Sequence, residues 1–187
     1  MTLIKRTVIS GMLLASCVLL PMAFHAVPGA GPMILPMHIP VLVAGLACGP
    51  VFGAAVGVIG PFLSNLLTGM PPTGPILLTM MIELGVYGAV TGLILKFLRL
   101  GRSAFDLYAA LIGAMLVGRI VAGFLQALFF FDGVYAIGVW TTQYFVTSLP
   151  GIVIQLVFLP SLVMALERER VIPARYSLDV KKDAALT

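Results

Sequence analysis

The chain has 187 residues, of which 60% are hydrophobic and only 10% are charged, with a net charge of +4. Soluble domains carry about 25% charged residues, so a water-soluble fold of this length could not hide so much apolar surface. The basic residues flank apolar segments, where they would meet a membrane surface, and this placement argues against nucleic-acid binding. The composition predicts one integral membrane domain.

The first apolar run extends from Val8 to Phe24 and follows Lys5 and Arg6, a start that is also typical of a signal peptide. The run is long enough to stay in the membrane, and no convincing small-residue cleavage site follows it. We therefore predict a first transmembrane helix over about 4–24, followed by a loop rich in Gly and Pro over 25–36.

The later spans are separated by Pro and Gly, and each is judged against the roughly 20 residues that cross a bilayer. We predict helices over 37–49, 50–68, 75–97, 107–131 and 139–167, with breaks at 69–75, 99–106 and Asp132-Gly133. The fold class is then an all-α membrane protein, a bundle of six transmembrane helices. Residues 1–168 would form the membrane domain, and 169–187 a polar cytoplasmic tail.

The predicted second helix, 37–49, is short. About 13 residues at roughly 1.5 Å each cover roughly 20 Å, whereas the hydrocarbon core is roughly 30 Å thick. One interpretation is that the preceding segment dips below the outer surface and lines a recessed cavity, because irregular backbone at membrane depth needs protein or water around it. The other is that the helix begins near Met33 and is kinked at Pro36 and Pro40. The sequence leaves both open.

The orientation follows from the basic residues. Every lysine and arginine except Arg119 lies at the start of the first predicted helix, at or after the end of the fourth and before the fifth, or after the sixth. The loops on the opposite side contain none. The positive-inside rule therefore predicts that both termini are cytoplasmic.

Small residues recur at every fourth position on several predicted helices. They are Gly45, Gly49, Gly53 and Gly57 on the second and third helices, Gly88 and Gly92 on the fourth, and Gly11 and Ala15 on the first. In lipid, such faces let two helix backbones approach closely. They indicate packing inside the bundle or a docking face for another membrane subunit.

Two ionisable side chains lie well inside the predicted spans, Glu83 and Arg119. A lone charge in hydrocarbon costs several kcal/mol, so each should face the interior, a partner or water. The two could pair with each other on adjacent antiparallel helices, or at least one could contact a substrate.

Uncharged polar groups are unevenly distributed along the predicted spans. The outer half contains His38, Ser64, Asn65, Thr79, Gln126, Gln143 and Tyr144, whereas the inner half offers little beyond Tyr87 and Thr91. Their convergence predicts a small polar pocket that is closed toward the cytoplasm by apolar packing.

Sequence motifs of catalysis are missing. The chain has no phosphate-binding G-x-x-x-x-G-K-[ST] loop, no G-x-S-x-G and no H-E-x-x-H, and its two cysteines, Cys17 and Cys48, fit no metal or redox spacing. We therefore expect a protein that is not an enzyme and needs no cofactor or metal.

Five stretches together resemble a known family: LPMHIPVLVAG at 35–45, CGP at 48–50, SNLLTGMPP at 64–72, MIELGVYG at 81–88 and GRIVAG at 118–123. The chain resembles the substrate-binding S components of energy-coupling factor (ECF) transporters, and is most similar to the pantothenate subgroup. The resemblance implies a subunit in a prokaryotic cell membrane that captures a vitamin outside and docks on a transmembrane scaffold subunit powered by two cytosolic ATPases. It also implies that a small-xxx-small face on the first helix contacts the scaffold, here at Gly11 and Ala15, and that the loops over 26–36 and 69–75 gate the site.

Pantothenate carries a carboxylate, which needs a donor or a positive group once it leaves water. Arg119, His38 and the backbone N–H groups at the start of the second helix could meet it. Asn65, Gln126 and Gln143 would then serve its hydroxyl and amide groups. For a hydroxymethylpyrimidine or a pyridoxine-like ring, Trp140 and Tyr144 would matter more as stacking surfaces. Folate, a secondary transporter and a membrane scaffold without transport remain alternatives.

Overall fold

The computed structural model describes residues 1–24, 29–98, 103–129 and 137–172. Its helices are α1 (Leu3–Phe24), α2 (Ala30–Ile34), α3 (His38–Cys48), α4 (Pro50–Thr68), α5 (Pro75–Phe97), α6 (Ser103–Phe129), α7 (Ile137–Thr141), the π-helical η1 (Thr142–Thr147) and α8 (Leu149–Arg168). The described residues form no strand. Six spans are long and apolar enough to cross a membrane, which confirms the predicted fold class.

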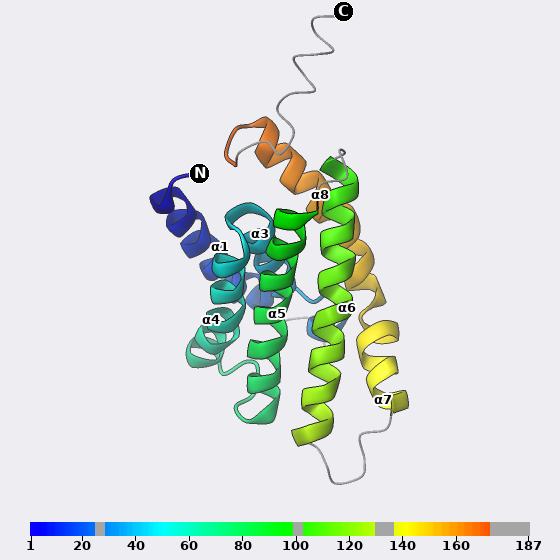
Figure 1. Ribbon diagram of the computed structural model, residues 1–187. Coiled ribbons are helices and arrows are strands. Elements are labelled where there is room, and N and C mark those ends of the chain that lie inside the picture. Colours follow the sequence, from blue (N-terminus) through cyan, green and yellow to red (C-terminus); the bar gives the residue numbers. More distant parts are fainter. Residues whose placement is uncertain (25–28, 99–102, 130–136, 173–187) are drawn as a thin grey trace, which may run out of the picture.

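The described basic residues of the span ends gather at one end of the bundle. Figure 1 shows the start of α1, the C-terminal end of α5 and the end of α8 on that side, and these segments carry Lys5, Arg6, Lys96, Arg168 and Arg170. Arg99, Arg102, Arg175, Lys181, Lys182, the tail over 173–187 and the Asp132-Gly133 break lie outside the described residues. The cytoplasmic location of this end stays a prediction.

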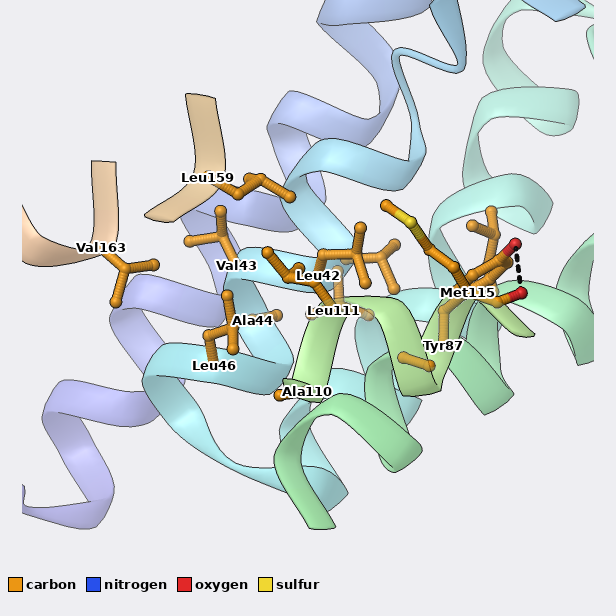
Figure 2. Packing of buried hydrophobic residues seen from close by; sticks show 14 of the residues in the cluster. Leu42, Val43, Ala44, Leu46, Tyr87, Ala110, Leu111, Met115, Leu159 and Val163 are labelled. Carbon is orange, nitrogen blue, oxygen red and sulfur yellow. Dashed lines mark hydrogen bonds between the residues drawn. The ribbon is translucent and has the colours of Figure 1, made fainter. Parts of the chain in front are cut away.

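Helix α3 lies at the centre of the bundle, in contact with α1, α4, α5 and α8. Its sequence is apolar on every side, and nearly all of its residues are buried, as expected for a helix surrounded by others. Leu42 packs in the same cluster as Leu111 of α6 and Leu159 of α8 (Figure 2). Because this apolar core occupies the middle of the bundle, polar groups can meet only toward its ends.

The glycine faces pack against each other inside the bundle. A β-carbon added at Gly53 of α4 would lie 2.5 Å from the carbonyl oxygen of Gly88 on α5, and one added at Gly45 of α3 would lie 2.5 Å from the same oxygen. Gly92 lies in the same way against the backbone of Gly49 and Pro50. These glycines therefore bring α3, α4 and α5 into backbone contact, as the internal-packing interpretation predicts.

Large apolar side chains cover the outside of the helices. Val51 is 77% exposed, and Phe124 and Val157 are similarly open. A water-soluble protein rarely leaves a continuous apolar surface of this kind uncovered. Hydrocarbon is the environment in which this surface is stable.

The prediction of one continuous helix over 139–167 is wrong, because α7, η1 and α8 divide that segment. Pro150 has no N–H to donate to the carbonyl of Val146, so the α-helical ladder cannot continue there. The hydroxyl of Ser148 instead donates to the carbonyl of Tyr144 at 2.5 Å. The prediction for the preceding span also missed a turn, since α6 begins at Ser103 and buries Asp106 in its first turn.

Candidate functional site

A cavity of about 800 Å³ lies at the end of the bundle opposite the basic residues. This volume falls within the range of small-molecule sites. Its wall is formed by the end of α1, the segment before α3, the loop after α4, the first half of α5, the second half of α6, and η1. The lining residues that carry polar side chains are His38, Ser64, Glu83, Arg119, Gln126, Gln143, Tyr144, Thr147 and Ser148.

The segment before α3 is broken, and the break lines the cavity. The chain leaves α2 at Leu35, which adopts a left-handed conformation with φ 54°, and α3 begins only at His38. Gln155 of α8 holds the break by donating to the carbonyl of Leu35 at 3.4 Å. The irregular backbone is thus packed against protein and borders the cavity, as the interpretation of a recessed segment predicts. The alternative, a continuous helix from Met33 with kinks, does not match the full break between α2 and α3.

One side of the cavity carries a chain of polar contacts around Glu83. The His38 Nε2 lies 3.9 Å from the Glu83 Oε1, and the Tyr144 hydroxyl donates to the Glu83 Oε2 at 3.5 Å. Gln126 donates to the Tyr144 hydroxyl at 2.7 Å. The Nδ1 of His38 is buried and has no hydrogen-bond partner. These contacts join α3, α5, α6 and η1 around one carboxylate.

Arg119 occupies a second position on the cavity wall. Its Nε donates to the Tyr87 hydroxyl at 3.1 Å, and one terminal nitrogen donates to the carbonyl of Tyr144. The guanidinium also lies over the ring of Phe145, 5.3 Å from its centroid. Its other terminal nitrogen donates to no acceptor among the described residues. The side chain is only 3% exposed, and the residue lines the cavity.

Glu83 and Arg119 do not form a direct ion pair, since no Arg119 nitrogen lies within 4.0 Å of the carboxylate. Tyr87 stands between them, with both charges close to its hydroxyl. Tyr144 contacts both residues, Glu83 through its hydroxyl and Arg119 through its carbonyl. The cavity therefore presents a positive and a negative position that are separate, and each remains available to a bound molecule.

The family model of the ECF transporter substrate-specific component matches residues 5–165. The chain belongs to this family. No curated protein and no solved structure matches it. S components are substrate-binding subunits of transporters and not enzymes, and they dock on an energising module that contains other subunits. The cavity described above is therefore the candidate substrate site of this S component.

Six of the nine predicted site residues line this cavity: His38, Glu83, Arg119, Gln126, Gln143 and Tyr144. They come from four separate helical elements of the S component. These residues share a depth in the predicted spans, and the fold brings them to one wall.

The other three predicted site residues lie outside the lining. Asn65 donates to the carbonyl of Pro71 at 2.6 Å and so fixes the loop that borders the cavity. Thr79 donates to the carbonyl of Pro75 within its own helix. The indole of Trp140 packs on Gly123, lies edge-on to Phe145 and donates to the carbonyl of Arg119 at 3.2 Å. In this S component these three side chains hold parts of the wall.

Several residues that shape the site were not predicted from the sequence. Tyr87 was assigned to the inner half, although it follows Glu83 by four positions and so shares its helix face. Its ring meets the His38 imidazole edge-on, with the centroids 5.1 Å apart. Met37, Met70 and Met80 supply apolar wall, and nothing in their sequence pattern separates them from lipid-facing methionines. Among the described residues, no three His, Cys, Asp or Glu side chains gather closely enough to hold a metal.

Proposed function

We propose that this S component captures pantothenate outside a prokaryotic cell and delivers it inward after docking on its energising module. The observation that carries the proposal is the Arg119 guanidinium, buried in the cavity wall with one terminal nitrogen unused. A charge-assisted hydrogen bond to a carboxylate would use that donor and neutralise a buried charge.

The remaining lining suits the rest of the molecule. Pantothenate has one amide and two hydroxyl groups, and Gln126 and Gln143 supply donors and acceptors along the same wall. Pro71, Pro72 and the methionines supply apolar contact for its methyl groups. The sequence resemblance to the pantothenate subgroup supports the same substrate.

The ring-stacking alternative has weaker support. It relies on Trp140 and Tyr144, but the Trp140 indole is packed between Gly123 and Phe145 and does not line the cavity. A hydroxymethylpyrimidine or pyridoxine-like ligand would then have Tyr144 as its aromatic surface on this wall. Either vitamin would leave the unused donor of Arg119 without a carboxylate.

The proposed assembly comprises a transmembrane scaffold and two cytosolic ATPases, with the outward surface of α1 as the docking face. Gly11 and Ala15 lie on the exposed side of α1, and a β-carbon added at Gly11 would meet no atom within 4 Å. A small-residue strip open to the outside is what a close helix–helix contact with another subunit requires.

A thermal-shift panel of vitamins on the detergent-purified chain tests the substrate. Pantothenate should raise the melting temperature, whereas pantothenol, which lacks the carboxylate, should shift it little. Arg119→Gln should weaken pantothenate binding by about 1–3 kcal/mol, the scale of a lost charged hydrogen bond. Arg168→Gln removes the same charge from an exposed position at the opposite end and should not affect binding.

Two results would contradict the proposal. If pantothenol binds as tightly as pantothenate, or only a pyrimidine binds, the carboxylate argument is wrong and only the family membership stands. If the purified chain alone carries the vitamin across liposomes, the docking model is wrong.

A further inference from the structure

A second cavity, of about 560 Å³, lies at the basic end of the bundle. It is formed by the first turns of α1, the corner between α3 and α4, and the last turns of α5. Helices α3 and α5 each run from the substrate cavity to this one, so the two cavities lie at opposite ends of the same helices. The proposed transport function does not use this second cavity.

Two cations face this cavity, and no acid lines it. Arg6 and Lys96 are its charged lining residues. The guanidinium of Arg6 donates to no acceptor among the described residues, and its Nε is buried without a partner. The Nζ of Lys96 lies 5.5 Å from the ring centroid of Phe97 and takes part in no ion pair within the described part of the chain. The cavity therefore has the electrostatic character of an anion site.

Backbone donors add to this character. The corner between α3 and α4 places the start of a 19-residue helix in the lining, with Pro50, Val51 and Phe52. Pro50 has no N–H, so the free donors of this turn are the N–H groups of Val51 and Phe52, which have no acceptor inside the helix and favour an anion. They would supplement the two side chains.

The rim of the cavity is apolar and open. Val51 lines the cavity and is 77% exposed, and Phe97, which follows the lining residue Lys96, is 75% exposed. An anion with a water-soluble body would leave these surfaces uncovered. An amphiphile would place its charged headgroup in the cavity and its apolar chains along the apolar rim.

We propose that this cavity holds the phosphate of an anionic phospholipid, with the acyl chains lying against Val51 and Phe97. The site stands at the ends of membrane spans, where basic residues meet lipid headgroups. Its lining combines positive charge with an apolar rim, which matches a lipid better than it matches free phosphate.

Native mass spectrometry of the full chain in detergent tests the proposal with phosphatidylglycerol, phosphatidylcholine of the same chains, and inorganic phosphate. The wild type should retain one phosphatidylglycerol more tightly than phosphatidylcholine. Arg6→Gln and Lys96→Gln should each weaken its binding about fivefold. Lys5→Gln removes an adjacent charge that does not line the cavity and should change binding less than twofold.

Equal loss with Lys5→Gln, or equal binding of phosphatidylcholine, would overturn the site, because general surface attraction would then explain the retention. Displacement of the lipid by millimolar inorganic phosphate would show a free-anion site and overturn the lipid assignment. The two substitutions stand in different helices, and the unliganded melting temperature of each identifies a variant that fails to fold. If only one variant folds, weaker phosphatidylglycerol binding by that variant supports the proposal, and unchanged binding by it overturns the proposal.

Discussion

Tyr87 orders Arg119 and His38, two lining residues of the cavity, without lining it itself. Its hydroxyl accepts from the Arg119 Nε at 3.1 Å, and its ring supports the His38 imidazole from the side. The hydroxyl is also directed to the carbonyl of Met115, 3.4 Å away (Figure 2). The orientation of Arg119 toward the cavity thus depends on a residue outside it.

Tyr87→Phe should therefore weaken substrate binding although it touches no substrate. Removing the hydroxyl leaves the Arg119 Nε without an acceptor, which costs about 1–3 kcal/mol, and part of that cost should be recorded as lost affinity. Titration calorimetry with the vitamin identified by the panel measures it. Thr91→Val removes a buried hydroxyl one turn further along α5, bonded to the Tyr87 carbonyl at 2.5 Å, and should leave the affinity unchanged. Equal losses in the two variants would show a general packing effect.

At the scale of elements, α3, α4 and α5 depend on glycine for their separation. Gly53→Ala would place a β-carbon 2.5 Å from the Gly88 oxygen and 2.7 Å from the Gly45 Cα, and both neighbours are backbone. We expect a destabilisation of about 1–3 kcal/mol, the cost of overpacking a close contact. Unfolding in mild detergent measures it. Gly11→Ala is the matched control, because nothing stands near Gly11, and it should be neutral or slightly stabilising.

Helix α1 allows a separate test of docking. Gly11→Leu or Ala15→Leu should abolish vitamin uptake by the complete transporter and reduce co-purification of its partners, while binding by the isolated chain persists. A bulky side chain separates closely packed helices but lies away from the substrate cavity. Ala55→Leu adds the same bulk to an exposed position on α4 and should leave uptake intact. If the α1 variants lose substrate binding instead, the docking face is assigned to the wrong side of the helix.

At the scale of the whole molecule, the two ends of the bundle differ in charge, and we propose a different ligand for each. Substrate would enter at the end that carries the loop after α4, and the energising module would act from the basic end. This orientation can be tested with single cysteines in a chain whose Cys17 and Cys48 are replaced by alanine. Thr73→Cys and Glu169→Cys are both exposed and lie at opposite ends.

In intact cells, an impermeant maleimide should label Thr73→Cys and should label Glu169→Cys only after the membrane is broken. The reverse pattern would place the substrate cavity on the cytoplasmic side and contradict uptake from outside. Equal labelling of both positions in intact cells would indicate mixed insertion and contradict the positive-inside argument for this chain.

The sequence by itself determined the six spans, the short α3 and the clustering of basic residues at the span ends. These features depend on the composition and length of the apolar segments, because the thickness of the bilayer sets how many apolar residues a spanning helix needs. The glycine faces of α4 and α5 could also be predicted from the sequence, because a spacing of four residues places the glycines on one side of each helix.

Only the tertiary structure decided which polar side chains reach the cavity and which hold its wall. Asn65 and Gln126 belong to the same residue class, yet one fixes the loop after α4 and the other lines the cavity. The π-helical turn at η1 and the break at Leu35 reset the rotational phase of the helices on either side. A sequence period cannot carry that phase across a break, so only the packed helices show which side chains of α3 and η1 reach the cavity.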